Sequence, residues 1–519
     1  MGRGSMTLVR RVFLAILSGA LLYAGHPPLA IGFAGYVALI PLIALIRDVG
    51  SGSTRAAFGY GYLGGLVAFA PLMYWLIPFG YAAFGGLTLV QAVYVGVFAA
   101  VTAWYGERRG RAVFTVAAWV ALEAFRGVWP LGGFGWGALA YTQADGGLVL
   151  GVARTLGTAG ISLVLATVAV ALEEAIRSGL HSWTAARDSD NPADTVFKAI
   201  QRPILTVLAV LSLAVLIGGE APAESGRTTS FGIVQGGDTR ATAAAGVTRL
   251  DSDRIIRVTE LMLEETRNFA EDPPDVVVWP ENSLDSDVRT DRGAVVADLL
   301  DEALALVAPS PILAGETQNG PRPRTLFNNM TVFTTAGAGQ SYSKRRPVPF
   351  AEYIPARAAL DWFPGLDQIP NDVLAADTPQ TLEVGGATVG GIICFENNFP
   401  ALARSQVREG ADVLVVGTNN SSFGLTPMSA QHVAFSQVRA VETGRWVVHA
   451  GISGISAFVS PEGEAFQQTG QFVPAAIRMD VPLIEGLTPA MRLGDTVAYV
   501  SAALLLAGIL FGSIDCRRR

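Results

Sequence analysis

Residues 275–283 read Asp-Val-Val-Val-Trp-Pro-Glu-Asn-Ser, an apolar run that ends in a carboxylate. Three successive valines with no polar alternation are typical of a strand buried on both faces. Residues 387–395 and 412–417 predict two further strands of this kind. Around them, residues 250–269 and 430–443 carry apolar side chains at helical spacing. Strands that alternate with helices predict a layered α/β or α+β domain.

The composition of the whole chain is too apolar for a protein that is soluble throughout. Of 519 residues, 50% are apolar and 16% are charged, whereas about 25% are charged in an ordinary soluble protein. The net charge of −7 excludes a broadly basic nucleic-acid binder. Two cysteines and four histidines provide neither a disulfide framework nor an obvious zinc site. We therefore predict no metal and no cofactor.

The apolar residues are concentrated in stretches of sequence that contain no charged residue. No charged residue occurs from Val12 to Ile46 or from Ala56 to Gly106. Each stretch can hold two helices of about 20 residues, the length that spans a bilayer. His-Pro-Pro at 26–28 and Pro-Phe-Gly at 78–80 interrupt them. Further spans are predicted at 112–128, 155–173, 202–219 and 496–514, which gives eight.

The basic residues give these spans an orientation. With eight spans, the flanking Lys and Arg residues fall on one side, which the positive-inside rule assigns to the cytoplasm. They are Arg10, Arg11, Arg47, Arg55, Arg108, Arg109, Arg111, Arg177, Arg187, Lys198, Arg202 and Arg517 to Arg519. Both termini are then cytoplasmic. Because seven spans precede the layered domain, that domain is predicted to be extracytoplasmic.

Four segments follow from this organisation. The first five residues precede Met6 and look like a leftover of cloning, so they are set aside. The predicted segments are a cytoplasmic N-terminus at 1–11, a membrane domain with spans one to seven at 12–219, the layered domain at 220–485, and span eight with a basic tail at 486–519.

Two residues stand at the ends of predicted strands. Cys394 closes the run 390–394 and could be a nucleophile presented at a sharp turn, or a buried core cysteine, which is equally common. Glu281 follows an apolar run directly and could accept a thiol proton as general base. It could also be an acidic residue that stabilises the start of a helix.

Other charged residues are ambiguous alone. Lys344, within Ser-Lys-Arg-Arg-Pro at 343–347, could stabilise an oxyanion, lie on a wet surface, or attract lipid headgroups. Glu352, eight residues on, could be an ordinary surface carboxylate. Glu123 and Arg126 lie three apart on a predicted membrane helix, where we expect them to pair with a structural or a functional role.

Together these pieces resemble a known family. Residues 279–281, Lys344 with 349–355, and 394–396 resemble the Glu-Lys-Cys triad of the nitrilase (carbon–nitrogen hydrolase) superfamily. An eight-span membrane domain around such a domain resembles the apolipoprotein N-acyltransferase family. Further similar segments are Phe134-Gly135-Trp136, 141–143, Gln431-His432, 439–445 and 454–457.

This resemblance implies a fold and a reaction. The fold is an αββα sandwich outside the cytoplasm, on a multi-pass protein of the bacterial cytoplasmic membrane. Cys394 would attack the sn-1 ester of a phospholipid, commonly phosphatidylethanolamine, and form a thioester. The α-amine of the diacylglyceryl-cysteine of an apolipoprotein would then take the acyl chain, in a ping-pong sequence. The resemblance implies a monomer without nucleic-acid partners.

It also implies roles for individual residues. Glu281 would be the base, Lys344 the oxyanion stabiliser and Cys394 the nucleophile. Glu352 would orient Lys344 or tune Glu281, while Phe395 and Glu396 would support the turn at the nucleophile. The stretch 353–364 could dip into the membrane surface or form a packed helix, and its candidate substrate-binding residues are Tyr353, Trp362 and Phe363.

Two other functions stay open. A membrane-tethered amidase would use the same triad with water in place of the amine, so the triad cannot discriminate the two. The eight-span domain favours a lipid donor, because a soluble amidase has no use for a membrane domain. A non-catalytic membrane scaffold is the third alternative, and the presence of all three triad residues argues against it.

Overall fold

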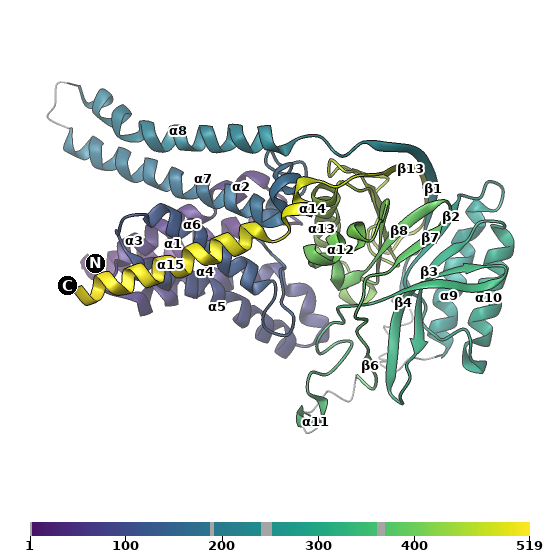
Figure 1. The fold of residues 1–519 in the computed structure, drawn as a ribbon. Helices are drawn as coiled ribbons and strands as arrows, with labels where there is room; N and C mark the ends of the chain where they lie inside the picture. The colour runs from purple at the N-terminus through teal and green to yellow at the C-terminus, as the bar shows by residue number, and fades with distance from the viewer. Residues whose placement is uncertain (1–2, 187–190, 240–251, 361–368, 519) are drawn as a thin grey trace. The chain divides into compact units, whose positions relative to one another are not determined.

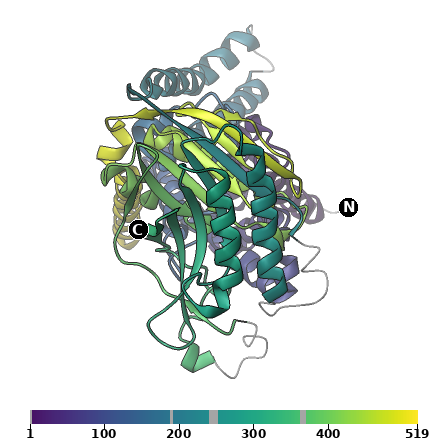
Figure 2. The same ribbon diagram turned by 90° about the vertical axis from the view of Figure 1, so that its right-hand side faces the viewer.

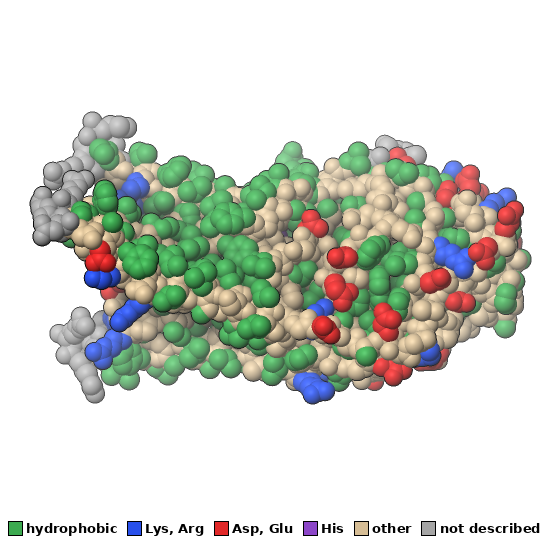
Figure 3. Space-filling model, turned by 90° about the horizontal axis from the view of Figure 1, so that it is seen from above, with side chains coloured by type: hydrophobic (Ala, Val, Ile, Leu, Met, Phe, Trp, Pro, Cys, Tyr) green, Lys and Arg blue, Asp and Glu red, His purple; other side chains and the backbone are tan. Residues whose placement is uncertain are grey.

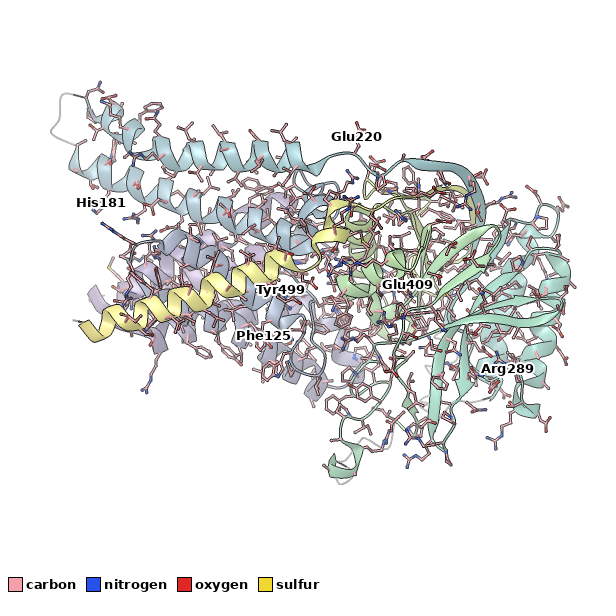
Figure 4. All side chains as sticks on the ribbon, viewed as in Figure 1. Phe125, His181, Glu220, Arg289, Glu409 and Tyr499 are labelled. Atoms are coloured by element: carbon pink, nitrogen blue, oxygen red, sulfur yellow. The ribbon has the colours of Figure 1, made fainter. Side chains whose placement is uncertain are left out.

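The computed structural model describes residues 3–186, 191–239, 252–360 and 369–518 (Figure 1). The chain forms two compact units, 1–220 with 493–519, and 221–492. Glu220, at the end of the first segment, is labelled in Figure 4. We call the first the helical unit and the second the layered unit, and describe each by itself.

The helical unit consists of helices, most of them joined by short connections, with a longer one between Arg126 and Val152. The first helix begins at Arg3, so residues 3–5 continue it ahead of Met6. The helices are α1 (Arg3–Ala24), α2 (Gly32–Val37), α3 (Leu39–Val49), α4 (Thr54–Leu72), α5 (Tyr81–Tyr105), α6 (Arg111–Arg126), α7 (Val152–Ala185), α8 (Pro192–Gly218) and α15 (Thr496–Arg518).

Six helical segments among the described residues are long and apolar enough to cross a membrane. They are Met6–Ala24, Gly32–Val49, Tyr81–Tyr105, Val152–Ala185, Pro192–Gly218 and Thr496–Ile514. Helix α4 is not among them, and α6 has only 16 residues and carries three charged ones. Eight spans therefore remain a prediction.

The surface of the helical unit suits a bilayer. In Figure 3, apolar side chains cover the face that this unit presents, and charged side chains lie at its end. Phe125 and Tyr499, labelled in Figure 4, are 47% and 72% exposed. Large apolar side chains left uncovered over such an area are normal where lipid is the solvent.

Glycines let α4 pack closely against α5. A Cβ atom on Gly61 would lie 2.6 Å from the Cβ of Ala99, and one on Gly65 would lie 2.8 Å from the Cα of Ala92. Both distances are shorter than real Cβ contacts, so only glycine permits this approach. Small residues have this role in membrane helix pairs generally, because dispersion contacts rather than the hydrophobic effect hold such pairs together.

This packing gives a first prediction. Gly61→Ala should destabilise the helical unit by about 1–3 kcal/mol, the usual cost of overpacking. The control is Gly59→Ala in the same helix, where a Cβ meets nothing within 4 Å; this change should be neutral or stabilise by up to about 1 kcal/mol through helix propensity. Thermal unfolding in detergent measures both, and equal melting temperatures would contradict the close contact.

The layered unit contains two sheets. The larger sheet has the order β13-β1-β2-β3-β4-β5, with β6 paired to β4. Its strands are β1 (Glu224–Gly236), β2 (Val276–Leu284), β3 (Ile312–Asn319), β4 (Thr325–Thr334), β5 (Gly337–Ser343), β6 (Asp372–Val373) and β13 (Pro474–Ile484). The smaller sheet runs β12-β11-β10-β9-β8-β7. Its strands are β7 (Thr381–Val384), β8 (Ala387–Ile393), β9 (Val413–Thr418), β10 (Val447–Gly451), β11 (Ala457–Val459) and β12 (Ala465–Phe466).

Helices cover the outer faces of the two sheets. Helices α9 (Ser252–Thr266) and α10 (Ala294–Leu306) lie side by side over the larger sheet (Figure 2). Helices α12 (Pro400–Arg408) and α13 (Met428–Thr443) pack on the smaller sheet. The short helices are α11 (Arg357–Leu360) and α14 (Pro489–Leu493). This arrangement confirms the predicted αββα sandwich.

The core between the sheets explains why the strands read as unbroken apolar runs. Val278, Leu313, Val389 and Val415 are almost completely buried there with side chains from both sheets. The neighbouring valine Val277 points to the other face and packs with α9 and α10. Strands covered on both faces need apolar residues at successive positions. The three predicted strands and two predicted helices are present, with different ends. The strand predicted at 387–395 ends at Ile393, because the chain turns there into a 3-10 helix at Cys394–Asn398, and the helix predicted at 250–269 ends in a 3-10 turn at Arg267–Phe269. Residues 250 and 251 lie outside the described part of the chain.

Candidate active site

Glu281 is held in an irregular part of β2. The pairing of β2 with β3 shifts between Trp279 and Leu284, and Asn282 has a φ of +58°. Glycine permits the bulge from both sides: a Cβ on Gly315 would lie 2.5 Å from the Cα of Glu281, and one on Gly417 would lie 3.3 Å from its backbone nitrogen. The carboxylate is therefore directed into the space between the two sheets rather than along the strand.

Lys344 meets Glu281 there. It follows the end of β5 and is completely buried. Its Nζ donates to Glu281 Oε1 at 3.0 Å and to Glu352 Oε1 at 2.7 Å. Burial acts to lower the pKa of Lys344, but the two carboxylates outweigh burial and raise the pKa well above its usual value. Lys344 is thus a permanently charged ammonium between two acids.

Two asparagines complete this cluster, and the sequence did not identify them. Asn328 Nδ2 donates to Glu281 Oε1 at 2.8 Å and to Glu352 Oε1 at 3.2 Å. The backbone N–H of Asn419 donates to Glu281 Oε2 at 2.9 Å. Asn419 follows the last residue of β9, so its place directly after a predicted strand could have identified it. Asn328 lies within β4, where no pattern distinguishes it.

Cys394 lies where β8 ends, at a φ of +52°. It is 9% exposed and begins the short 3-10 helix Cys394–Asn398. Burial raises the pKa of its thiol well above the usual value, and the nearby Glu281 carboxylate adds to this, whereas Lys344 acts in the opposite direction. Burial and Glu281 together thus favour the protonated thiol over the thiolate.

Glu396 ties the turn after β8 to the segment after β5. Its Oε1 accepts the backbone N–H groups of Arg345 at 2.7 Å and Arg346 at 3.1 Å. Its Oε2 accepts the N–H of Ile393 and the hydroxyl of Tyr342, both at 2.8 Å. A buried carboxylate with four donors holds Cys394 and Lys344 in fixed relation, because it fixes the residue next to each.

The remaining predicted residues are more peripheral. Phe395 is half-buried and packs edge-on against Phe399, with ring centroids 5.0 Å apart. The backbone carbonyl of Tyr353 accepts from Phe350 at 2.8 Å. Trp362 and Phe363 lie outside the described residues, so nothing here bears on their predicted contact with substrate. Of the stretch 353–364, only Arg357–Leu360 is described as helix.

Among the described contacts Glu123 and Arg126 of the helical unit share no hydrogen bond or ion pair, although their charges do act on each other, as expected. Glu123 accepts from the backbone of Leu139 at 2.8 Å and from the hydroxyl of Ser162. Arg126 donates to Gln91 at 3.0 Å and to backbone carbonyls. Each charge is satisfied by polar groups of neighbouring segments, which a spacing rule within one helix cannot reveal.

Comparison with known proteins now shows what the chain is similar to. Residues 18–171 match the model of the apolipoprotein N-acyltransferase N-terminal domain, and residues 246–483 match that of carbon-nitrogen hydrolase. The apolipoprotein N-acyltransferase of Mycolicibacterium smegmatis is 29% identical over 98% of this chain and 85% of its own length. That of Geobacter metallireducens is 28% identical, over 97% and 95%. Over nearly its whole length the chain is thus similar to apolipoprotein N-acyltransferases.

The protein is therefore an acyltransferase whose layered unit has the carbon–nitrogen hydrolase fold. With its six apolar helices, it is a bacterial membrane protein. An amidase of the nitrilase superfamily from Nesterenkonia AN1 also aligns with it, at 16% identity and a TM-score of 0.35, over 51% of this chain and 94% of the amidase.

The charges around Cys394 predict its reactivity. Alkylation by iodoacetamide needs only the thiolate. Glu281→Gln removes a negative charge that raises the thiol pKa, so alkylation at neutral pH should become faster. Lys344→Met removes the positive charge that lowers the thiol pKa, so alkylation should become slower. Peptide mass spectrometry separates Cys394 from Cys516, and equal rates in all three proteins would contradict the coupling.

Proposed function

We propose that the chain transfers an acyl chain from a phospholipid, such as phosphatidylethanolamine, to the α-amine of the diacylglyceryl-cysteine of bacterial apolipoproteins. The acyl chain would pass through a thioester on Cys394. One observation carries the proposal: a completely buried ammonium, Lys344, lies between Glu281 and Glu352 beside a thiol at a strand end. Base, cation and nucleophile are the parts that acyl transfer needs.

In the first half-reaction, Cys394 Sγ attacks the ester carbonyl while its proton passes to Glu281. Negative charge develops on the carbonyl oxygen, and Lys344 stabilises it. The bond from the carbonyl carbon to the glycerol oxygen then breaks, Glu281 returns the proton to that oxygen, and a lysophospholipid leaves. Loss of one such charge-stabilising donor typically lowers the rate by about 10²–10³-fold.

In the second half-reaction, the acceptor amine attacks the thioester. Glu281 takes a proton from the attacking nitrogen, the carbon–sulfur bond breaks, and the proton passes to the departing sulfur. The thiol is restored and an amide is formed. The same carboxylate acts as base in both halves because each half begins with a nucleophile that carries a proton.

We also propose that both termini are cytoplasmic, that the layered unit lies outside the cytoplasm and that the chain is a monomer. Contacts within the helical unit support one part of this, the gathering of basic residues at one end. Arg11 donates to Asp48 at 2.7 Å, and Arg47 donates to Glu174 at 2.7 Å. These pairs join α1 to α3 and α3 to α7, so basic residues that the positive-inside rule assigns to the cytoplasm gather at one end of the helices.

The central test is intact-protein mass spectrometry after incubation with phosphatidylethanolamine vesicles and no acceptor. The wild type should gain one fatty-acyl mass that hydroxylamine removes, and Cys394→Ala should gain none. Glu281→Gln should also fail, even though its thiol alkylates readily, because the leaving oxygen lacks its proton donor. A folded wild type without the increment, but with ammonia release from simple amides, would support the amidase alternative.

Single cysteines test the orientation. In a background without Cys394 and Cys516, a cysteine replaces exposed Glu409 of the layered unit or exposed His181 at the end of α7 (Figure 4). A membrane-impermeant maleimide added to cells with an intact plasma membrane should label Glu409→Cys. It should label His181→Cys only after permeabilisation. The reverse pattern would contradict the topology.

A further inference from the structure

A row of polar side chains leads away from Glu281 on the side opposite Lys344. Asp285, just after β2, accepts from Asn282 Nδ2 at 3.2 Å and from Thr317 Oγ1 at 2.7 Å, both on its Oδ1. Asn282 Oδ1 in turn accepts from Asn419 Nδ2 at 3.1 Å. The backbone N–H of the same Asn419 donates to Glu281 Oε2. The row therefore ends on the base of the proposed reaction.

The direction of every hydrogen bond in the row follows from Asp285. Burial raises the pKa of Asp285, but in its ionised form the carboxylate can only accept. Asn282 then turns its NH₂ group toward Asp285 and its oxygen toward Asn419. Asn419 must then donate with its own NH₂ group. Its Oδ1 is left to accept from the hydroxyl of Ser421 at 2.7 Å and from the Ser421 N–H at 3.2 Å. No amide in the row can flip without breaking a bond at both ends.

The row also fixes the unusual backbone of the bulge. Asn282 adopts a φ of +58°, a conformation that non-glycine residues adopt only when their surroundings hold them there. Its side chain is bound on both sides, to Asp285 and to Asn419. The charged groups that act on Asp285 are Arg254 of α9 and Glu281 itself.

We propose that Asp285 is a positioning residue for Glu281. Through Asn282 and Asn419 it holds a donor on Glu281 Oε2, while Oε1 is occupied by Lys344 and Asn328. The carboxylate is thereby fixed in the orientation in which it exchanges a proton with Cys394 and with the substrates. This inference rests on the proposed function, because it concerns the base of that reaction.

The experiment measures single-turnover acyl-enzyme formation by the full-length protein, from phosphatidylethanolamine vesicles without acceptor, over a range of pH. Asn282→Gly breaks the row without changing any charge, and glycine adopts the positive φ freely. Asp285→Asn keeps the size of the side chain but replaces one carboxylate oxygen with an NH₂ group. The side chain then donates as well as accepts hydrogen bonds. Asp287→Asn is the matched control, since Asp287 bonds to Arg289 (Figure 4) and to the backbone of Asn319, outside the row.

The role predicts a distinct pattern. Asn282→Gly should acylate roughly tenfold more slowly at neutral pH, the effect expected when a bond to a charged group is weakened. The acid limb of its pH profile should move to higher pH, because a carboxylate with a weaker donor holds its proton more tightly. Asp285→Asn should also be slower, although the loss of a negative charge beside Glu281 would by itself favour the ionised base. Asp287→Asn should behave as the wild type.

Other outcomes would overturn the inference. One is Asn282→Gly with the wild-type rate, or with a rate lowered equally at every pH, as a general loss of fold would give. If Asn282→Gly does not fold, Asp285→Asn decides alone, and a rate equal to that of Asp287→Asn overturns the role of Asp285. A wild type that forms no acyl-enzyme contradicts the proposed function and, with it, the base that Asp285 would position.

Discussion

The ammonium of Lys344, buried between the carboxylates of Glu281 and Glu352, is the interaction on which the site depends. Burial of an unpaired charge in such a place would strongly destabilise the fold. Removal of one partner from a buried ion pair costs about 3–5 kcal/mol of stability. All three charges must therefore be brought together as the layered unit folds. Glu281 lies in β2, Lys344 follows the end of β5, and Glu352 lies in the loop after it. The contacts among them therefore constrain both the larger sheet and that loop.

The charges in this cluster do not balance, and the imbalance has a chemical consequence. One ammonium faces two carboxylates, so a thiolate on Cys394 would add negative charge to a site that already has an excess. This is why burial and Glu281 together raise the thiol pKa despite Lys344. A resting thiolate, as in a cysteine paired with a cationic histidine, is thus disfavoured. In the proposed reaction the proton would therefore leave for Glu281 as sulfur attacks, which would couple nucleophile and base in one step.

Sequence reasoning singled out Glu281 and Cys394 because each follows an unbroken apolar run, as strands buried on both faces produce. The predicted strand end is wrong for Glu281, which lies within β2 because that strand continues through an irregular stretch to Leu284, whereas Cys394 does follow the end of β8. Sequence reasoning failed for Asn328, which lies within β4 and faces the cluster only because of the pairing of β4 with β3. It also missed the hydrogen-bond partners of Glu123 and Arg126, which come from outside their helix. A linear pattern reports local periodicity, whereas these contacts are set by tertiary packing.

The irregularity in β2 links the fold to the chemistry. A regular strand would place alternate side chains on opposite faces, and Glu281 would then lie in one of two apolar layers where its charge could not be satisfied. The bulge at Asn282 breaks that alternation, and Gly315 and Gly417 leave room for it between the sheets. Glu281 can therefore meet donors on both of its oxygens: Lys344 and Asn328 on one, and the backbone of Asn419 on the other. Two glycines and one asparagine with positive φ thus allow a strand of the core to hold a buried carboxylate that is hydrogen-bonded on both oxygens.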